Sequence, residues 1–383
     1  MPAFKSRIES ALAERKTQGL NRPMNVVFAG NQSVLEHEGR RYINFSSNDY
    51  LGLANDQALV RAWQQGLSVY GSGSGASPMV TGFSAAHSNL EAALTEWLGY
   101  DRAILFGSGF SANQALLFTL LEKSDVLIQD RLNHASLMEA GALSPAKMKR
   151  FKHNDIEHLK SLINSEDNHL VVTEGVFSMD GDCAPLTDIA EVTRSHDAWF
   201  AVDDAHGIGV LGQSGGGSCE LATVKPEILI VTFGKAFGMS GAAILCDHAT
   251  GDFLTQFARH HVYSTAIPPA QAYALTHAVS MVQEQSWRRE KLSELSEVYR
   301  DCLSDLEGFV ETQTSIKPFV IGESELALQV ASACRQNGIW VTAIRPPTVP
   351  KGTSRLRITL TANHTNEQVK TLSMALKQAL GAL

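Results

Sequence analysis

The sequence predicts an α/β protein with a mostly parallel, doubly wound large domain and a smaller C-terminal α+β domain. Short apolar runs rich in β-branched residues alternate with helical patterns through the middle of the chain, as expected of buried strands joined by helical crossovers. A long helical stretch then leads to a last segment in which strands and helices are mixed. The 44% hydrophobic and 19% charged residues, in a chain of 383, are typical of globular proteins and exclude a disordered or fibrous one.

The N-terminal segment is expected to form a helix followed by a hairpin. Phe4, Ile8 and Leu12 recur at helical spacing among charged residues, and those charges exclude a secretory signal. Residues 33–45 have the pattern of a β-hairpin, with Glu38-Gly39 as its turn.

Within the large domain, a helix is expected over residues 84–98, ending at Gly99. Its strands are expected at residues 103–106, 126–128, 170–173, 200–202, 228–233 and 242–245.

The C-terminal part begins with helical spacing over residues 269–306. Strands are expected near residues 317–321, 340–344 and 356–360, and a last helix starts at Thr365, where Gln368 completes a capping box. We expect residues 1–50 to form an N-terminal helix and hairpin segment, 51–285 the large domain and 286–383 the small domain.

Charge and cysteine usage exclude several classes of protein. The 32 basic and 40 acidic side chains give a net charge of −8, and the basic ones are scattered, so no nucleic-acid partner is expected. No window approaches the roughly 18 apolar residues of a membrane span. The five cysteines include no Cys-x-x-Cys pair, which predicts free thiols in a reducing cytoplasm and no metal site.

Polar residues follow three of the expected strands, at the edge where ligands bind in open parallel sheets. Asp203 follows one strand directly, with His206 three residues later, and Lys235 lies on a glycine-flanked turn after another. A third strand ends in the glycine turn 107–109, which opens a helix and can direct backbone N–H groups at a phosphate.

Together these features predict pyridoxal phosphate as a cofactor. A lysine amine forms a Schiff base with its aldehyde, and an acid such as Asp203 can keep its ring nitrogen protonated. Lys235 lies in a segment otherwise free of charge, where loss of water lowers the pKa of a lysine. Each signal also has a structural interpretation: Asp203 as a turn or cap residue, Lys235 as a solvated side chain, and His134 as a capping or core histidine.

Five motifs in order resemble one known family. They are the stretches Asn-Phe-Ser-Ser-Asn-Asp-Tyr-Leu-Gly at 44–52, Thr-Glu-Gly-Val-Phe-Ser-Met-Asp-Gly at 173–181, Asp-Asp-Ala-His-Gly at 203–207, Thr-Phe-Gly-Lys at 232–235, and Ile-Arg-Pro-Pro-Thr-Val-Pro at 344–350 with Arg-Leu-Arg at 355–357. Over nearly its whole length the chain resembles the α-oxoamine synthases, which are fold-type-I, aminotransferase-like pyridoxal phosphate enzymes.

The resemblance implies a role for each residue around the cofactor ring. Lys235 would form the Schiff base and remove the α-proton, and Asp203 would pair with the ring nitrogen. His206 and Ser178 would reach the ring hydroxyl, and His134 would stack on the ring. In the same way, backbone N–H groups of Gly109 and Phe110 would meet the cofactor, with Thr232 near its phosphate.

The resemblance also implies the substrates. Arg357 would hold the amino-acid carboxylate, with Asn48 also binding substrate, and Arg22 and Thr348 would meet the acyl group. The expected reaction is the condensation of L-alanine with a pimeloyl thioester, carried on coenzyme A or acyl carrier protein, with loss of carbon dioxide. The family works as homodimers, in which Tyr263-Ser264-Thr265 could belong to the partner's site.

Three other functions fit parts of the sequence. Gly107-x-Gly109-x-x-Ala112 and Asp130 fit a dinucleotide fingerprint and hence an NAD-dependent dehydrogenase, which would leave Lys235 without a role. A sister synthase that uses glycine and a short acyl-CoA would have the same catalytic residues. A binding protein that has lost its chemistry is the third, and the intact Lys235 argues against it.

Overall fold

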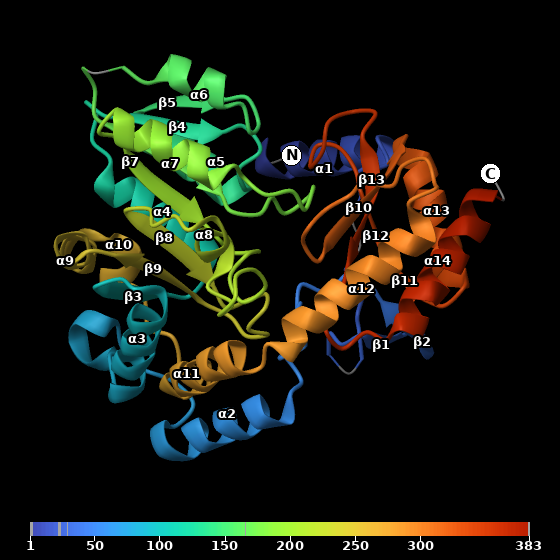
Figure 1. Ribbon diagram of the computed structural model, residues 1–383, viewed down its shortest axis with the longest axis horizontal. Coiled ribbons are helices and arrows are strands. Elements are labelled where there is room, and N and C mark those ends of the chain that lie inside the picture. Colours follow the sequence, from blue (N-terminus) through green and yellow to red (C-terminus); the bar gives the residue numbers. More distant parts are fainter. Residues whose placement is uncertain (1–2, 22–23, 29, 165, 382–383) are drawn as a thin grey trace.

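The computed structural model describes residues 3–21, 24–28, 30–164 and 166–381. Its largest sheet consists of β3 (Arg102–Phe106), β4 (Val126–Asp130), β5 (Lys147–Phe151), β6 (His169–Glu174), β7 (Trp199–Asp203), β8 (Ile228–Thr232) and β9 (Ala242–Cys246). The strand order is β3-β9-β8-β7-β6-β4-β5 (Figure 1). β9 is antiparallel to both neighbours, and the other strands run parallel, which confirms the mostly parallel sheet.

Helices cover both faces of this sheet. The helical segments between β2 and α12 are α2 (Gln57–Tyr70), the π-helical turn η1 (Pro78–Gly82), α3 (Ala85–Leu98), α4 (Gly109–Leu120), α5 (Ala135–Leu143), α6 (Ile156–Leu162), α7 (Leu186–Ser195), α8 (Gly217–Ala222), α9 (His248–Phe257), α10 (Arg259–Val262) and α11 (Pro269–Glu284), of which α2 packs on α11 (Figure 1). Alternate strand residues enter different cores: Ile228 and Ile230 belong to the core under α4 and α5, whereas Leu229 and Val231 belong to the core on the opposite face. The sheet is therefore doubly wound, as predicted.

One strand of the sheet was not predicted. β5 has the sequence Lys-Met-Lys-Arg-Phe and pairs only with β4 at the end of the sheet. An edge strand has only one neighbour and tolerates charged side chains, so it lacks the apolar run by which the buried strands were found.

The predicted N-terminal elements are present as α1 (Ala3–Thr17), β1 (Val34–His37) and β2 (Arg40–Asn44). Glu38 and Gly39 make the turn with φ angles of 51° and 73°. β2 also pairs in parallel with β11 (Ile339–Trp340), so the hairpin joins the C-terminal part of the chain.

The small domain begins with α12 (Trp287–Leu303), which continues from α11 after a break and leads away from the large sheet (Figure 1). The elements that follow are β10 (Ile316–Gly322), α13 (Ser324–Gln336), β12 (Thr342–Ile344), β13 (Ser354–Thr359) and α14 (Asn366–Gly381). The three strands form an antiparallel sheet in the order β10-β13-β12. The capping box is confirmed, because Thr365 Oγ1 accepts from Gln368 N at 3.2 Å and Gln368 Oε1 accepts from Thr365 N at 3.0 Å.

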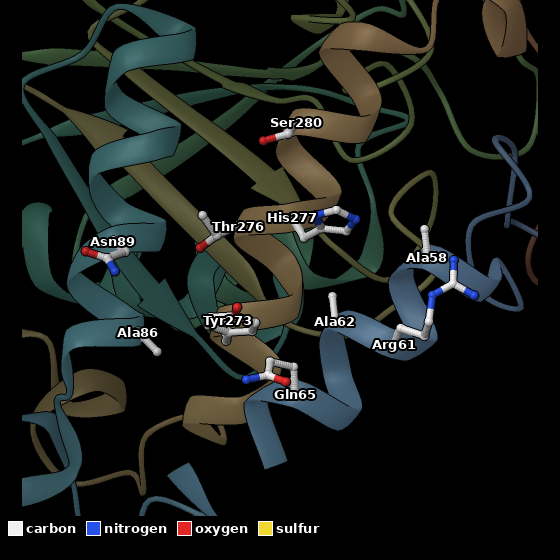
Figure 2. Close-up of a pocket in the computed structure, with 10 residues that line it drawn as sticks. All are labelled: Ala58, Arg61, Ala62, Gln65, Ala86, Asn89, Tyr273, Thr276, His277 and Ser280. Carbon is white, nitrogen blue, oxygen red and sulfur yellow. The ribbon is translucent and has the colours of Figure 1, made fainter. Parts of the chain in front are cut away.

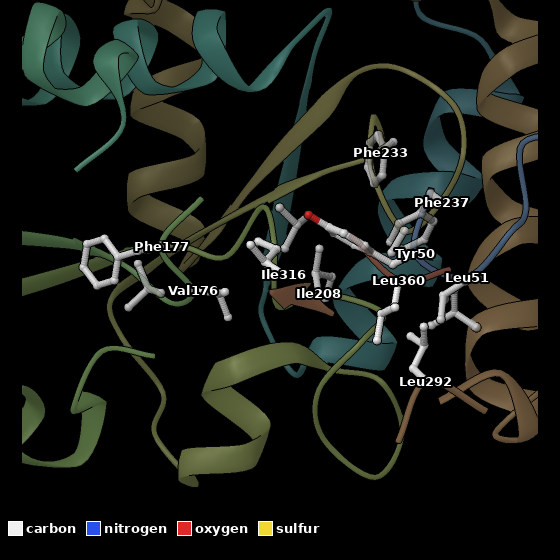
Figure 3. Packing of buried hydrophobic residues seen from close by; sticks show 14 of the residues in the cluster. Tyr50, Leu51, Val176, Phe177, Ile208, Phe233, Phe237, Leu292, Ile316 and Leu360 are labelled. Atoms are coloured by element: carbon white, nitrogen blue, oxygen red, sulfur yellow. The ribbon is translucent and has the colours of Figure 1, made fainter. Parts of the chain in front are cut away.

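One apolar core runs through both domains. Figure 3 shows Phe233 and Phe237 of the large domain close to Tyr50 and Leu51, in the same buried cluster as Ile316 of the small domain. All five are less than 2% exposed. Shared burial of this kind fixes the small domain against the edge of the sheet where the predicted site residues lie.

Among the described helices, none combines the length and apolarity that crossing a membrane requires. The five cysteines are unpaired, as expected.

Candidate active site

A cavity of about 210 Å³ lies at the carboxyl edge of the large sheet, beyond the ends of β3, β4, β6, β7 and β8. The carboxyl ends of parallel strands share one edge, so residues distant in sequence meet there. It is lined by Gly107, Ser108, Gly109, Phe110, Asn113, His134, Ser136, Glu174, Asp203, Ala205, His206, Thr232, Gly234, Lys235, Ser240 and Gly241.

Asp203 is the last residue of β7 and is 4% exposed. Its Oδ2 accepts a hydrogen bond from Asn113 Nδ2 at 2.7 Å, and its Oδ1 accepts from Ala205 N at 3.1 Å. These two donors fix the carboxylate, so its negative charge has a set orientation in the cavity.

Lys235 lies on the turn after β8. Burial lowers the pKa of its amine below the ordinary value, the negative charges of Asp203 and Glu174 oppose this shift, and Arg357 adds to it. No ion pair within 4.0 Å is found for its Nζ among the described residues. The amine is thus available to a ligand and easier to deprotonate than a surface lysine.

His206 is 6% exposed, and its Nδ1 lies 2.7 Å from the hydroxyl of Tyr50. Burial, together with the nearby charge of Lys235, lowers the pKa of His206 well below 6.5, so the ring is neutral. The Tyr50 hydroxyl accepts from Arg357 Nη2 at 3.4 Å. Its own proton has two acceptors, Asn48 Oδ1 at 3.3 Å and the closer His206 Nδ1, and donation to Nδ1 puts the His206 proton on Nε2.

His134 follows β4 and is the N-cap residue of α5, where its Nδ1 accepts from Ser136 N at 3.3 Å and lies 2.8 Å from Ser136 Oγ. The capping interpretation is correct, and His134 also lines the cavity. Partial burial lowers the pKa of His134, against the attraction of Asp203. Ser136 Oγ accepts from Asn113 Nδ2 at 2.9 Å, so one amide group connects His134 with Asp203.

The N-terminus of α4 opens on the cavity, with Gly109 and Phe110 as its first two residues. The first N–H groups of a helix have no partner within it and attract anions. A Cβ at Gly109 would lie 2.6 Å from Thr232 Cγ2, so only glycine fits here without a shift. Thr232 Oγ1 is buried and has no hydrogen-bond partner.

Glu174 ends β6 beside Asp203 and is 3% exposed, with Oε1 lacking a hydrogen-bond partner. Burial and the charge of Asp203 raise the pKa of Glu174 well above its usual range.

Comparison with known proteins decides the family. Residues 40–376 match the model of the family aminotransferase class I and II. The 8-amino-7-oxononanoate synthases of Vibrio campbellii and Vibrio parahaemolyticus are 93% and 90% identical to this chain, over the full length of each. The chain belongs to the 8-amino-7-oxononanoate synthase family.

Solved structures show the same fold. A serine palmitoyltransferase of Sphingomonas wittichii aligns with a TM-score of 0.93 at 30% identity over 98% of each chain. The 8-amino-7-oxononanoate synthase of Francisella tularensis aligns with a TM-score of 0.78 at 29% identity, covering 89% of this chain and 98% of the other. The fold is the aminotransferase-like, fold-type-I fold that the motifs implied.

As a member of this synthase family, the chain is an enzyme of biotin biosynthesis that depends on pyridoxal phosphate. The cavity fits this group on three observations. Lys235 brings an unpaired amine, Asp203 brings a fixed carboxylate, and an unpartnered hydroxyl of Thr232 lies beside the helix N-terminus at Gly109.

Not every predicted residue lines the cavity. Arg357, which is 8% exposed, lies outside it and donates from Nε to the backbone oxygen of Ser178 at 2.6 Å and from Nη1 to Asn48 Oδ1 at 3.0 Å. Thr348 is exposed on the loop before β13. Arg22 lies outside the described residues.

Asn113, Tyr50 and Glu174 are among the residues in or beside the cavity that had no predicted role. Asn113 lies on α4 and Tyr50 within the motif at 44–52, and no local pattern indicated that they contact Asp203 and His206. Glu174 was visible as an acid at the end of an apolar run.

The dehydrogenase alternative fails at the acid that it requires. Asp130 is fully buried, and its carboxylate accepts hydrogen bonds from the backbone N–H groups of Leu132 and Asn154 and pairs with His153. It has no oxygen left for a ribose.

A larger cavity, of about 650 Å³, lies away from this edge, between α2, α3 and α11 (Figure 2). Arg61 and His277 are the basic residues of its wall, which otherwise consists of alanine and uncharged polar side chains. It contains no lysine or carboxylate, so the chemistry belongs to the smaller cavity.

Proposed function

We propose that the chain condenses L-alanine with a pimeloyl thioester, giving 8-amino-7-oxononanoate, carbon dioxide and the free thiol. The supporting observation is that Lys235, Asp203 and His206 line one cavity and that Tyr50 connects His206 to Arg357. When bound, pyridoxal phosphate supplies an aldehyde that combines with an amine and a ring that delocalises negative charge from the α-carbon.

Lys235 is the general base in this proposal. Its Nζ would hold the cofactor and, with alanine bound, would take the α-proton. The lowered pKa of Lys235 favours the unprotonated amine that both tasks need. Asp203 would keep the ring nitrogen protonated by ionic attraction, and Asn113 keeps the carboxylate of Asp203 in place.

The remaining cofactor contacts follow the family resemblance. The first N–H groups of α4, at Gly109 and Phe110, and the hydroxyl of Thr232 would hold the phosphate. His206 would donate from Nε2 to the ring hydroxyl, and His134 would lie against the ring.

Arg357 binds the carboxylate of alanine through its guanidinium. Ser178 O, Asn48 Oδ1 and the Tyr50 hydroxyl all accept from this group and orient it. That carboxylate leaves as carbon dioxide after the new carbon–carbon bond forms. Its ion pair with Arg357 is therefore broken during the reaction.

Thr348 and Arg22 meet the acyl chain. In support, Arg345 Nη1 donates to Gly19 O at 2.7 Å, which brings the loop of Thr348 to the end of α1.

The active unit is a homodimer in the cytoplasm. Large apolar side chains are exposed on and beside η1 and after α10, including Val80 at 74% and Tyr263 at 78%. These two segments are joined by the hydrogen bond from Ala266 N to Ala76 O at 3.0 Å. A second copy that covers them would bring Tyr263-Ser264-Thr265 to its partner's cavity.

A product assay tests the reaction. Purified chain is given alanine or glycine with pimeloyl or acetyl thioester, and the amino ketone is identified by mass. Formation of 8-amino-7-oxononanoate at the highest kcat/KM supports the proposal. A preference for glycine with acetyl thioester would overturn it in favour of the sister activity, which relies on the same catalytic residues.

A further inference from the structure

A charged cluster lies outside the cavity, behind two of its loops. His153, two residues after β5, has Nδ1 at 3.1 Å from Asp130 Oδ1 and Nε2 at 2.8 Å from Asp182 Oδ2. Phe177 packs against the ring with centroids 4.4 Å apart. None of these residues lines the cavity, and no role in the proposed reaction falls to them.

The geometry requires a positively charged ring. Each ring nitrogen of His153 faces a carboxylate oxygen, and a carboxylate can only accept, so both nitrogens must carry a proton. Burial opposes the charge, but the hydrogen bonds and negative charges of Asp130 and Asp182 outweigh it and raise the pKa of His153 to about 9. The other described neighbours, Asn154 and Phe177, do not titrate.

On one side the cluster is anchored to the sheet. Asp130 is the last residue of β4, and its carboxylate also accepts from the backbone N–H groups of Leu132 and Asn154 at 2.8 and 2.9 Å. This acid is fully buried and held by several donors, so it is the fixed end.

On the other side the cluster holds the loop between β6 and α7. Asp182 accepts from His153 and from Asn154 Nδ2, at 3.0 Å, and its backbone oxygen accepts from Phe177 N at 3.0 Å. The loop between these anchor points contains Ser178, whose oxygen accepts from Arg357, and Asp180, which pairs with Arg355. The position of this loop thus decides where the guanidinium of Arg357 is held.

We propose that His153 is a positioning residue: held between Asp130 and Asp182, it fixes the loop after β6 and so sets where Ser178 orients Arg357. This inference rests on the proposed role of Arg357 in binding alanine. Without the charge on His153 the loop loses its charged link to the large sheet. Asn154 Nδ2 still donates to Asp182, but the backbone oxygen of Ser178 that accepts from Arg357 is held less firmly. Binding of alanine should suffer, whereas the thioester and the proton transfer at Lys235 should not.

The test compares His153→Gln and Asp182→Asn with His196→Gln. His196 is an exposed histidine bonded only within α7 and its end, so its substitution controls for the loss of an imidazole. The first readout is hydrogen exchange of the backbone amides of residues 175–184 without substrates. The second is the KM for alanine, the KM for pimeloyl thioester and kcat.

The expected result for both cluster variants is faster exchange in residues 175–184 and a KM for alanine about tenfold higher, equivalent to about 1.4 kcal/mol. The KM for the thioester and kcat should each stay within about twofold of the values of the unmodified enzyme, a difference equivalent to about 0.4 kcal/mol. In the unmodified enzyme the KM for alanine should rise above pH 9, and in Asp182→Asn that rise should be reduced. Asp182→Asn also provides the answer if His153→Gln does not fold.

Unchanged exchange in both variants, or faster exchange with an unchanged KM for alanine, would overturn the proposal. An Arg357→Lys variant separates it from the proposed function. If that change leaves the KM for alanine unaltered, the assignment of Arg357 has failed, whereas the exchange data still report whether His153 holds the loop.

Discussion

The hydroxyl of Tyr50 lies 2.7 Å from Nδ1 of His206, although 156 residues separate the two in sequence. Tyr50 is fully buried, and the same hydroxyl accepts from Arg357 on β13. One oxygen therefore connects the cavity of the large domain with an arginine of the small domain.

Tyr50→Phe should lower kcat/KM for alanine by about 10- to 100-fold. The change leaves His206 Nδ1 and Arg357 Nη2 buried without this partner, and an unsatisfied buried polar group costs about 1–3 kcal/mol. Steady-state kinetics with alanine varied would measure it. Tyr299→Phe is the matched control, because the Tyr299 hydroxyl is buried without a hydrogen-bond partner. Equal kinetics for Tyr50→Phe and the unmodified enzyme would mean that the contacts of the Tyr50 hydroxyl with His206 and Arg357 do not contribute to the reaction of alanine.

Asp203→Asn should lower the rate of exchange of the α-proton of alanine with solvent by orders of magnitude while the cofactor still binds. The amide keeps the shape but removes the negative charge that favours a protonated ring nitrogen. NMR in heavy water measures the exchange. Asp204→Asn is the control, because burial raises the pKa of Asp204 to about 7 and its carboxyl is occupied by Ser218. If both variants exchanged alanine alike, Asp203 would have no special role.

Thr232→Val should weaken binding of pyridoxal phosphate without lowering the melting temperature of the cofactor-free protein. The hydroxyl of Thr232 is buried without a partner in the chain, so its loss removes no internal hydrogen bond. Thr314→Val should do the reverse, since the hydroxyl of Thr314 donates to Gly181 O at 2.8 Å. Titration with cofactor and thermal unfolding distinguish the two. A lower melting temperature of cofactor-free Thr232→Val would mean that the hydroxyl of Thr232 stabilises the folded chain itself, and would contradict a role confined to cofactor binding.

The stabilisation provided by His153 should depend on pH. Its pKa is 6.5 without neighbours and about 9 in the folded chain, so the stabilisation is complete below pH 6.5 and is lost as the pH rises through 9. This stabilisation is at most about 3.4 kcal/mol, since a difference of one in pKa corresponds to about 1.36 kcal/mol. The melting temperature of His153→Gln should lie below that of His196→Gln at pH 6 and approach it at pH 10. A difference independent of pH would argue for a neutral ring.

The sequence was most informative where burial dictates residue type. Strands β6, β7 and β8 are buried on both faces, so their apolar runs stand out, and polar residues at or just after the end of such a run are candidates for the site. Asp203 and Lys235 were predicted in this way, whereas Glu174 at the end of β6 was not. β5 was missed because an edge strand does not need an apolar run.

The partners of these residues could not be predicted. The contact of Asn113 with Asp203 spans 90 positions, and that of Arg357 with Ser178 spans 179. Such pairings follow from how helices and domains pack on the sheet, and no local pattern encodes them. The cluster of His153 was hidden for the same reason, since its two carboxylates come from the end of β4 and from the loop between β6 and α7.

The central claim is that Lys235 carries the chemistry. Borohydride reduction of the holoenzyme, followed by peptide mapping, tests it most directly. Lys317 is the internal control, because burial also lowers its pKa, to about 8, but its Nζ donates to Thr312 O in the small domain. We expect the cofactor to be attached to the peptide that contains Lys235, and we expect no labelled peptide from Lys235→Ala. Attachment to Lys317 or another lysine, or none at all in the unmodified enzyme, would contradict it.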